Sequence, residues 1–245
     1  MVAVMQPVDY LAALRHDADR LVTAAEGHLD RVVPSCPGWC VSDLVWHVGI
    51  VQMFWRMIAS GALTGPDGWH EPDRPAGDDL LPWFRHGIDL TVASLTDLAP
   101  DTPAWTWGRR QDVGFIRRRV AQETAVHCWD GQNAVGCTEP IARVLAVDGV
   151  DEFFDEVLPG LGRDRDGPAQ TIRLRAGDAD RAWTVRAGGG VVQLIDPAEP
   201  PDATVTGTAA NLLLLVWGRC AADSAHLRVD GDLAALRRFL ARAEF

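Results

Sequence analysis

The chain has 245 residues, 47% of them hydrophobic, and its 34 acidic and 23 basic residues give a formal net charge of −11. This acidic balance argues against nucleic acid or an anionic membrane as the main partner. The apolar run at 212–217 is only six residues long, against roughly 18 for a membrane span. Because the N-terminus also has no signal-like segment, we expect a cytoplasmic protein of one or two domains.

Apolar residues in the first 136 positions recur at steps of three and four, the spacing of one face of a helix. A loop rich in turn residues, 34–40, precedes the second helix, and an extended connection at 101–107 precedes the fourth. Four helices of this length favour a four-helix bundle. The predicted helices span 7–29, 41 to about 58, 78–98 and 114–135.

The fourth predicted helix carries polar residues on its inward face. That face reads Ile116, Val120, Glu123, His127, Asp130 and Ala134. Glu123 and His127 lie one helical turn apart, so both side chains can reach one cation. Two interpretations stay open at this point. Either the row binds a metal ion, or it forms a buried Glu–His–Asp hydrogen-bond network without one.

A third metal ligand is available on the second predicted helix. His47 neighbours Leu44 and Val51, so it faces the apolar side of that helix. A single histidine in such a place is most often a satisfied core residue. It becomes a candidate ligand because a glutamate and a histidine face inward on another helix.

The second half of the chain mixes strands and helices, which indicates a small α+β domain. A linking helix covers 141–158, and a Gly/Asp/Arg loop follows at 159–168. The predicted fold class is therefore α+β in two domains, a four-helix bundle at 1–137 and an α+β domain at 138–245. The expected strands are 171–176, 183–187, 191–195, 203–206 and 226–229, and the expected helices are 208–218 and 233–243.

Three segments together resemble one protein family. Cys36-Pro-Gly-Trp-Cys-Val-Ser-Asp-Leu-Val-Trp-His47 resembles the "CPGWTVxDLVxH" segment of the mycothiol-dependent maleylpyruvate isomerase family, a branch of the DinB-like metalloenzymes. Glu123-Thr-Ala-Val-His-Cys-Trp-Asp130 is similar to that family's "ExxxHxWD" signature. The tail, 205–219 with 229–232, is similar to its sterol-carrier-like C-terminal domain.

The resemblance implies a divalent metal, usually zinc, held by His47, Glu123 and His127. Two histidines and one glutamate leave a coordination position open for water, thiol or substrate. Asp130, near His127 on the same helix face, is a candidate to orient the His127 ring, and the alternative is that it accepts a hydrogen bond from a buried tryptophan. Arg219 is a candidate for binding a substrate or thiol carboxylate, and a surface role is its alternative.

One residue departs from the family pattern. Cys40 stands where the family has serine or threonine, which weakens a helix cap by a few tenths to about 1 kcal/mol or places a spare thiol near the site. Cys36 and Cys40 have no matching second pair for a zinc ribbon. With five cysteines, an odd number, no disulfide framework is expected.

Two classes of function follow from these features. The first is an enzyme that uses mycothiol as thiol cofactor or co-substrate with a small electrophilic substrate, as an isomerase or a thiol S-transferase. The alternatives are a non-catalytic ligand-binding or regulatory protein on the same fold, or a metal-dependent hydrolase. A monomer or a homodimer is expected. The predicted helix at 114–135 contains no H-E-x-x-H motif, in which a glutamate that does not bind the metal acts as general base. Its absence disfavours the hydrolase.

Overall fold

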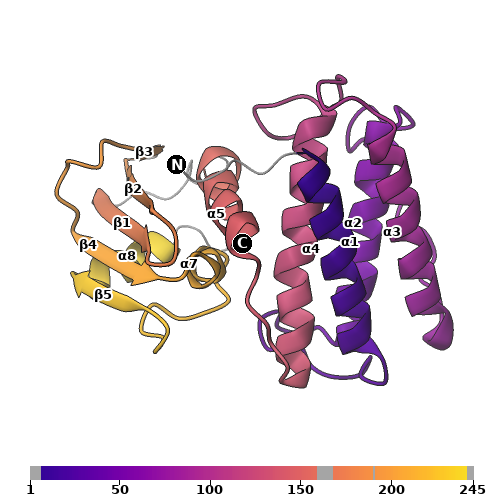
Figure 1. Cartoon of the computed structure of the whole chain (residues 1–245), viewed down its shortest axis with the longest axis horizontal. Coiled ribbons are helices and arrows are strands. Elements are labelled where there is room, and N and C mark those ends of the chain that lie inside the picture. Colours follow the sequence, from indigo (N-terminus) through magenta and orange to yellow (C-terminus); the bar gives the residue numbers. More distant parts are fainter. Residues whose placement is uncertain (1–6, 159–167, 190, 242–245) are drawn as a thin grey trace. The chain divides into compact units, whose positions relative to one another are not determined.

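The computed structural model of the chain describes residues 7–158, 168–189 and 191–241. These residues form two compact units, one ending at Glu139 and the other beginning at Pro140. The first is helical and the second contains a five-stranded mixed sheet, so the predicted two-domain α+β class is confirmed (Figure 1). The domain boundary predicted at 137/138 stays a prediction. No helix within the described ranges is both long and apolar enough to cross a lipid bilayer.

The first unit consists of four long helices, with a 3-10 turn, η1, before the third (Figure 1). Large apolar side chains on their inner faces, among them Leu14, Leu44, Phe84 and Ile116, are at most 1% exposed. No β-strand occurs at 7–136, where only the isolated bridges Val32–Cys40 and Pro103–Asp112 are found. The helices are α1 (Pro7–Ala25), α2 (Val41–Ala59), η1 (Gly77–Asp79), α3 (Leu80–Thr96) and α4 (Val113–Val135).

Helix α4 has defined signals at both ends. Asp112 precedes it, and its Oδ1 accepts a hydrogen bond from the Phe115 N–H at 2.9 Å, which caps the first turn. Gly136 follows it with φ of 75°, a conformation that only glycine adopts without strain. The first helix was predicted to reach residue 29 but ends at Ala25, because Gly27 turns the chain with φ of 74°.

Close packing of α4 against α1 depends on Gly131. A Cβ atom at this position would lie 2.6 Å from Cδ1 of Leu21, which is fully buried. Because glycine has no side chain, α1 and α4 can approach closely here. This close approach places the inward face of α4 in the bundle core.

The second unit begins with α5 (Arg143–Glu152), which continues into a π-helical turn, η2 (Phe153–Val157). The sheet order is β3-β2-β1-β4-β5, with β1 and β4 parallel and all other neighbours antiparallel. The remaining elements are β1 (Gln170–Ala176), β2 (Arg181–Gly188), β3 (Val191–Leu194), β4 (Ala203–Gly207), α7 (Ala209–Val216), β5 (Arg228–Gly231) and α8 (Leu233–Ala241).

The last strand begins two residues later than the sequence predicted. His226 and Leu227 belong to a turn closed by the Leu227 N–H and the Ser224 carbonyl, and pairing with β4 starts at Arg228 opposite Thr206. The other predicted elements of this half lie within two residues of those observed. Residues 159–167 of the predicted loop at 159–168, and the predicted helix end at 242–243, lie outside the described residues.

Candidate functional site

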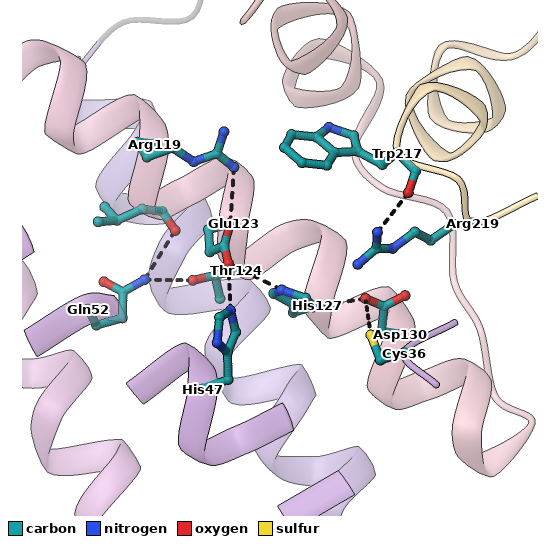
Figure 2. Close-up of polar contacts among 11 residues, drawn as sticks. Cys36, His47, Gln52, Arg119, Glu123, Thr124, His127, Asp130, Trp217 and Arg219 are labelled. Atoms are coloured by element: carbon teal, nitrogen blue, oxygen red, sulfur yellow. Dashed lines mark hydrogen bonds and ion pairs between the residues drawn. The ribbon is translucent and has the colours of Figure 1, made fainter. Parts of the chain in front are cut away.

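Three of the residues singled out in the sequence meet inside the first unit. His47 from α2 and Glu123 and His127 from α4 point toward one another (Figure 2). Oε1 of Glu123 lies 3.1 Å from Nε2 of His47 and 3.2 Å from Nε2 of His127. One donor atom from each residue falls within 4.8 Å of the other two.

The meeting of α2 and α4 is supported one turn away by Gln52. Its Nε2 donates to Oγ1 of Thr124 at 2.8 Å and to the Val120 carbonyl at 3.2 Å (Figure 2). Gln52 is 1% exposed, so these bonds lie inside the bundle. They fix the position of α2 along the axis of α4 and thereby place His47 opposite Glu123.

Each oxygen of Glu123 has a different neighbour. Oε1 faces the two histidines, whereas Oε2 lies 3.3 Å from Nη2 of Arg119, one turn earlier on α4 (Figure 2). The Arg119 side chain is 5% exposed and that of Glu123 19%. The guanidinium therefore holds the carboxylate with one oxygen turned to the histidines.

Asp130 holds the opposite side of the His127 ring. Its Oδ2 lies 2.8 Å from Nδ1 of His127, and its side chain is fully buried. Asp130 also accepts hydrogen bonds from Ser35 Oγ at 2.6 Å and from Cys36 Sγ at 3.7 Å. With Nδ1 bonded to the carboxylate, Nε2 is directed at Glu123, the orientation expected of a metal-binding histidine.

The electrostatics of this cluster are those of a tightly coupled ion pair. Burial raises the pKa of Glu123, but the charge and hydrogen bond of His127, the hydrogen bond of His47 and the charge of Arg119 outweigh it, so that pKa lies well below its ordinary value. Burial lowers the pKa of His127, but the charge of Glu123 and the bond to Asp130 hold it well above the ordinary range. Both shifts favour the charged forms, because the carboxylate and the imidazolium each stabilise the other.

The residues also fit a divalent cation. Ligands at 2.0–2.1 Å from a tetrahedral zinc ion lie about 3.3 Å apart. The separations of 3.1 and 3.2 Å between Oε1 and the two Nε2 atoms approach that value. The metal site and the hydrogen-bond network that the sequence left open thus share one geometry, and ligand roles for these residues stay a prediction.

An aromatic side chain borders both histidines. The Trp39 ring centroid lies 4.9 Å from that of His47 and 6.4 Å from that of His127. Sequence reasoning did not single out Trp39, Ser35 or Arg119 as site residues. Trp39 and Ser35 flank the Cys-Pro-Gly segment, and Arg119 is four residues before Glu123, so position next to the motifs was the available signal.

Two further candidates from the sequence are Cys40 and Arg219. Sγ of Cys40 lies 2.9 Å from Oδ2 of Asp43 at the start of α2, so this thiol joins the helix cap, and Cys36 is the cysteine beside His127 and Asp130. Arg219 belongs to the second unit, where its Nη1 donates to the Trp217 carbonyl at 2.7 Å (Figure 2). Its role toward a carboxylate stays a prediction.

Arg109, Arg110 and Arg117–Arg119 form a basic cluster in this acidic sequence, and its composition favours a solvated face. The structure instead buries part of it. Arg117 is 5% exposed and its guanidinium donates to the carbonyls of Leu95 and Leu98 at the end of α3. Arg119 is 4% exposed and faces Glu123. Arg110 remains exposed and pairs with Asp112.

Comparisons with known proteins cover both units. Residues 11–131 match the family model described as "Mycothiol maleylpyruvate isomerase N-terminal domain", and residues 144–238 match the "MDMPI C-terminal domain". No curated protein matches the chain. A crystal structure of the mycothiol-dependent maleylpyruvate isomerase is similar with a TM-score of 0.64 and 14% identity, over 94% of this chain and 95% of that one.

A second solved structure gives the same result. It is a histidine-to-alanine mutant of the mycothiol-dependent maleylpyruvate isomerase, with a TM-score of 0.66 and 13% identity over 94% of this chain and 95% of that one. At such low identity these two likenesses concern the fold.

Proposed function

The chain belongs to the mycothiol-dependent maleylpyruvate isomerase family, and on this premise we propose that it is a metal-dependent enzyme that uses a low-molecular-weight thiol, mycothiol, to isomerise a small electrophilic substrate. The observation that carries the proposal is the meeting of His47, Glu123 and His127 on two helices. A purely structural core would more simply hold apolar residues there.

His47 Nε2, Glu123 Oε1 and His127 Nε2 are the atoms that would hold the cation, which we expect to be zinc. When bound, a divalent cation supplies positive charge that favours the thiolate form of a thiol. This donor set brings one negative charge, so the occupied site keeps net positive charge for an anionic ligand.

The surrounding residues prepare the donors. Asp130 accepts a hydrogen bond from Nδ1–H of His127. In this tautomer the lone pair on Nε2 faces the site. Arg119 donates a hydrogen bond to Oε2 of Glu123, so that Oε1 alone faces the histidines. Trp39 borders both rings and provides an apolar wall against water.

The reaction we propose needs no net redox change. The thiolate adds to an electrophilic carbon of a cis double bond, and the resulting single bond rotates. The same carbon–sulfur bond then breaks, which restores the double bond in trans form and releases the thiolate. If the adduct instead takes up a proton at the neighbouring carbon and is released before that step, the protein is an S-transferase.

The first prediction tests this use of a thiol. Turnover of maleylpyruvate should require added mycothiol, and Glu123→Gln should abolish it, because the amide lacks the charge that a cation and two histidines share. The measurement is the rate of substrate consumption with and without mycothiol. Glu26→Gln, which alters an exposed pair with Arg85 on the bundle surface, is the matched control and should keep the wild-type rate.

Equal turnover with and without mycothiol would overturn the proposal in favour of a hydrolase. Tight binding of mycothiol without turnover of any electrophile would favour the non-catalytic alternative.

A further inference from the structure

A second group of potential metal ligands lies on the other side of His127. Cys36, His127 and Asp130 each offer one ligand atom, and these atoms lie within 4.8 Å of one another. We propose that these three residues form a second cation site, specific for thiophilic ions, that competes with the first site for His127. The inference goes beyond the proposed function and does not depend on turnover.

The two groups use opposite nitrogens of one ring. Nε2 of His127 lies 3.2 Å from Oε1 of Glu123, whereas Nδ1 lies 2.8 Å from Oδ2 of Asp130. A neutral imidazole has one nitrogen with a lone pair and one with a proton. The ring therefore serves one cation at a time, and the two sites are mutually exclusive.

The distances rank the two sites. Sγ of Cys36 and Oδ2 of Asp130 are 3.7 Å apart, close to the roughly 3.5 Å expected between sulfur and oxygen ligands of one tetrahedral zinc ion. Nδ1 and Oδ2 are closer, at 2.8 Å, and must separate by about 0.5 Å to reach ligand spacing. The two separations at Oε1 of Glu123 lie closer to ligand spacing than the two at Oδ2 of Asp130, so we expect an ion without preference for sulfur at the first site.

The chemistry of the donors selects the ion for the second site. A thiolate and a carboxylate bring two negative charges, which balance a divalent cation in a buried place. The first site has only nitrogen and oxygen donors and one negative charge. Thiolate favours soft ions such as Cd²⁺. Asp130 is fully buried, but Cys36 is partly exposed on the turn before α2, which gives an ion access from solvent.

The competing interpretation is that Cys36, like Ser35, only donates a hydrogen bond to Asp130. Titration of the metal-free protein with Cd²⁺, in the absence of any added thiol, separates the two. Binding at Cys36 produces ultraviolet charge-transfer absorption from thiolate to cadmium. We expect this absorption to rise to a plateau at one equivalent in the wild type.

Three variants complete the experiment. Cys36→Ser keeps a hydrogen-bond donor but should lose the charge-transfer absorption, while Cys40→Ser, the matched control, should keep it. His47→Ala disables only the first site and should also keep it. Circular dichroism checks that each variant is folded.

Absence of the absorption in the folded wild type, or its persistence in Cys36→Ser, would overturn the second site. Two equivalents of bound Cd²⁺ by equilibrium dialysis would overturn the sharing of His127. Because no mycothiol or substrate is present, either result leaves the proposed function standing, and a failure of mycothiol-dependent turnover leaves this inference standing.

Discussion

At the scale of single residues, the His127 ring contacts several other residues of the candidate site. One ring nitrogen faces Glu123 and the other faces Asp130, and the ring lies beside Trp39 and His47. Arg119, also on α4, donates a hydrogen bond to Oε2 of Glu123, the carboxylate oxygen that does not face the histidines. Both residues can be tested by measurements that need no substrate.

The second prediction concerns metal content. Wild-type protein should purify with close to one equivalent of a divalent ion, and His127→Ala should purify without it, because this ring is common to both proposed sites. His86→Ala, an exposed histidine on α3, is the matched control and should retain the ion. The measurement is elemental analysis after purification without added metal. Full retention by His127→Ala would contradict the assignment.

The third prediction concerns Arg119. Arg119→Met should lower the free energy of unfolding of the metal-free protein by about 1–3 kcal/mol, because a largely buried carboxylate loses a charged partner. Saturating Zn²⁺ should reduce this loss, since the cation also balances Glu123. Denaturant unfolding with and without Zn²⁺ measures both quantities.

Arg15→Met is the control for Arg119, because its pair with Asp89 is half exposed and should contribute under 1 kcal/mol with or without the ion. A loss for Arg119→Met that does not depend on Zn²⁺ would contradict the proposal that the cation and Arg119 balance the same carboxylate.

At the scale of elements, the start of α2 shows how a cysteine takes the place of the usual capping residue. Asp43 accepts hydrogen bonds from the thiol and the backbone N–H of Cys40, both at 2.9 Å. Arg74 adds a bond to the other carboxylate oxygen at 2.6 Å. This contact ties the 61–76 connection to the first turn of the helix that carries His47.

The fourth prediction follows from the pKa of Asp43, which hydrogen bonds from Cys40, and then from Arg74, lower to about 2. A carboxyl in the unfolded chain titrates near pH 4. Because the folded pKa is depressed, the stabilisation is present above about pH 4 and is lost as the pH falls toward 2.

Asp43→Asn should therefore lower the melting temperature at pH 7 and have a much smaller effect at pH 2. Thermal unfolding of both proteins at the two pH values measures the difference. An equal effect at both values would contradict the role of the Asp43 charge.

At the scale of the whole molecule, the donors of the first proposed site come from one unit only. His47, Glu123 and His127 all precede Glu139, whereas Arg219 belongs to the second unit. We therefore expect that the proposed cation binding and the proposed recognition of a carboxylate by Arg219 can be tested separately.

The fifth prediction uses this separation. Arg219→Met should raise the KM for mycothiol or for substrate at least several-fold and leave the metal content unchanged, because it removes a carboxylate partner and no ligand. Arg237→Met, which alters an exposed pair with Asp223 on the same unit, is the control. Steady-state kinetics with elemental analysis tests both. An unchanged KM for mycothiol and for substrate would contradict ligand binding by Arg219 and favour the alternative of a surface role.

The sequence by itself determined the features that depend on local periodicity. The four helices, the strands and the inward direction of Glu123, His127 and Asp130 follow from spacings of two, three or four residues along one element. His47 was found because its helix has a clear apolar face. The α+β class followed from the order of such elements and is confirmed.

Only the tertiary structure decided which groups share a contact. Ser35 and Cys36 reach Asp130 from a loop more than 90 residues earlier, and no periodic pattern encodes such a contact. The burial of Arg117 and Arg119 depends on the end of α3 and on Glu123, so composition alone suggested solvent. The parallel pairing of β1 with β4 likewise joins segments far apart in the chain. Local spacing fixes the direction of a side chain, but packing between elements selects its partner.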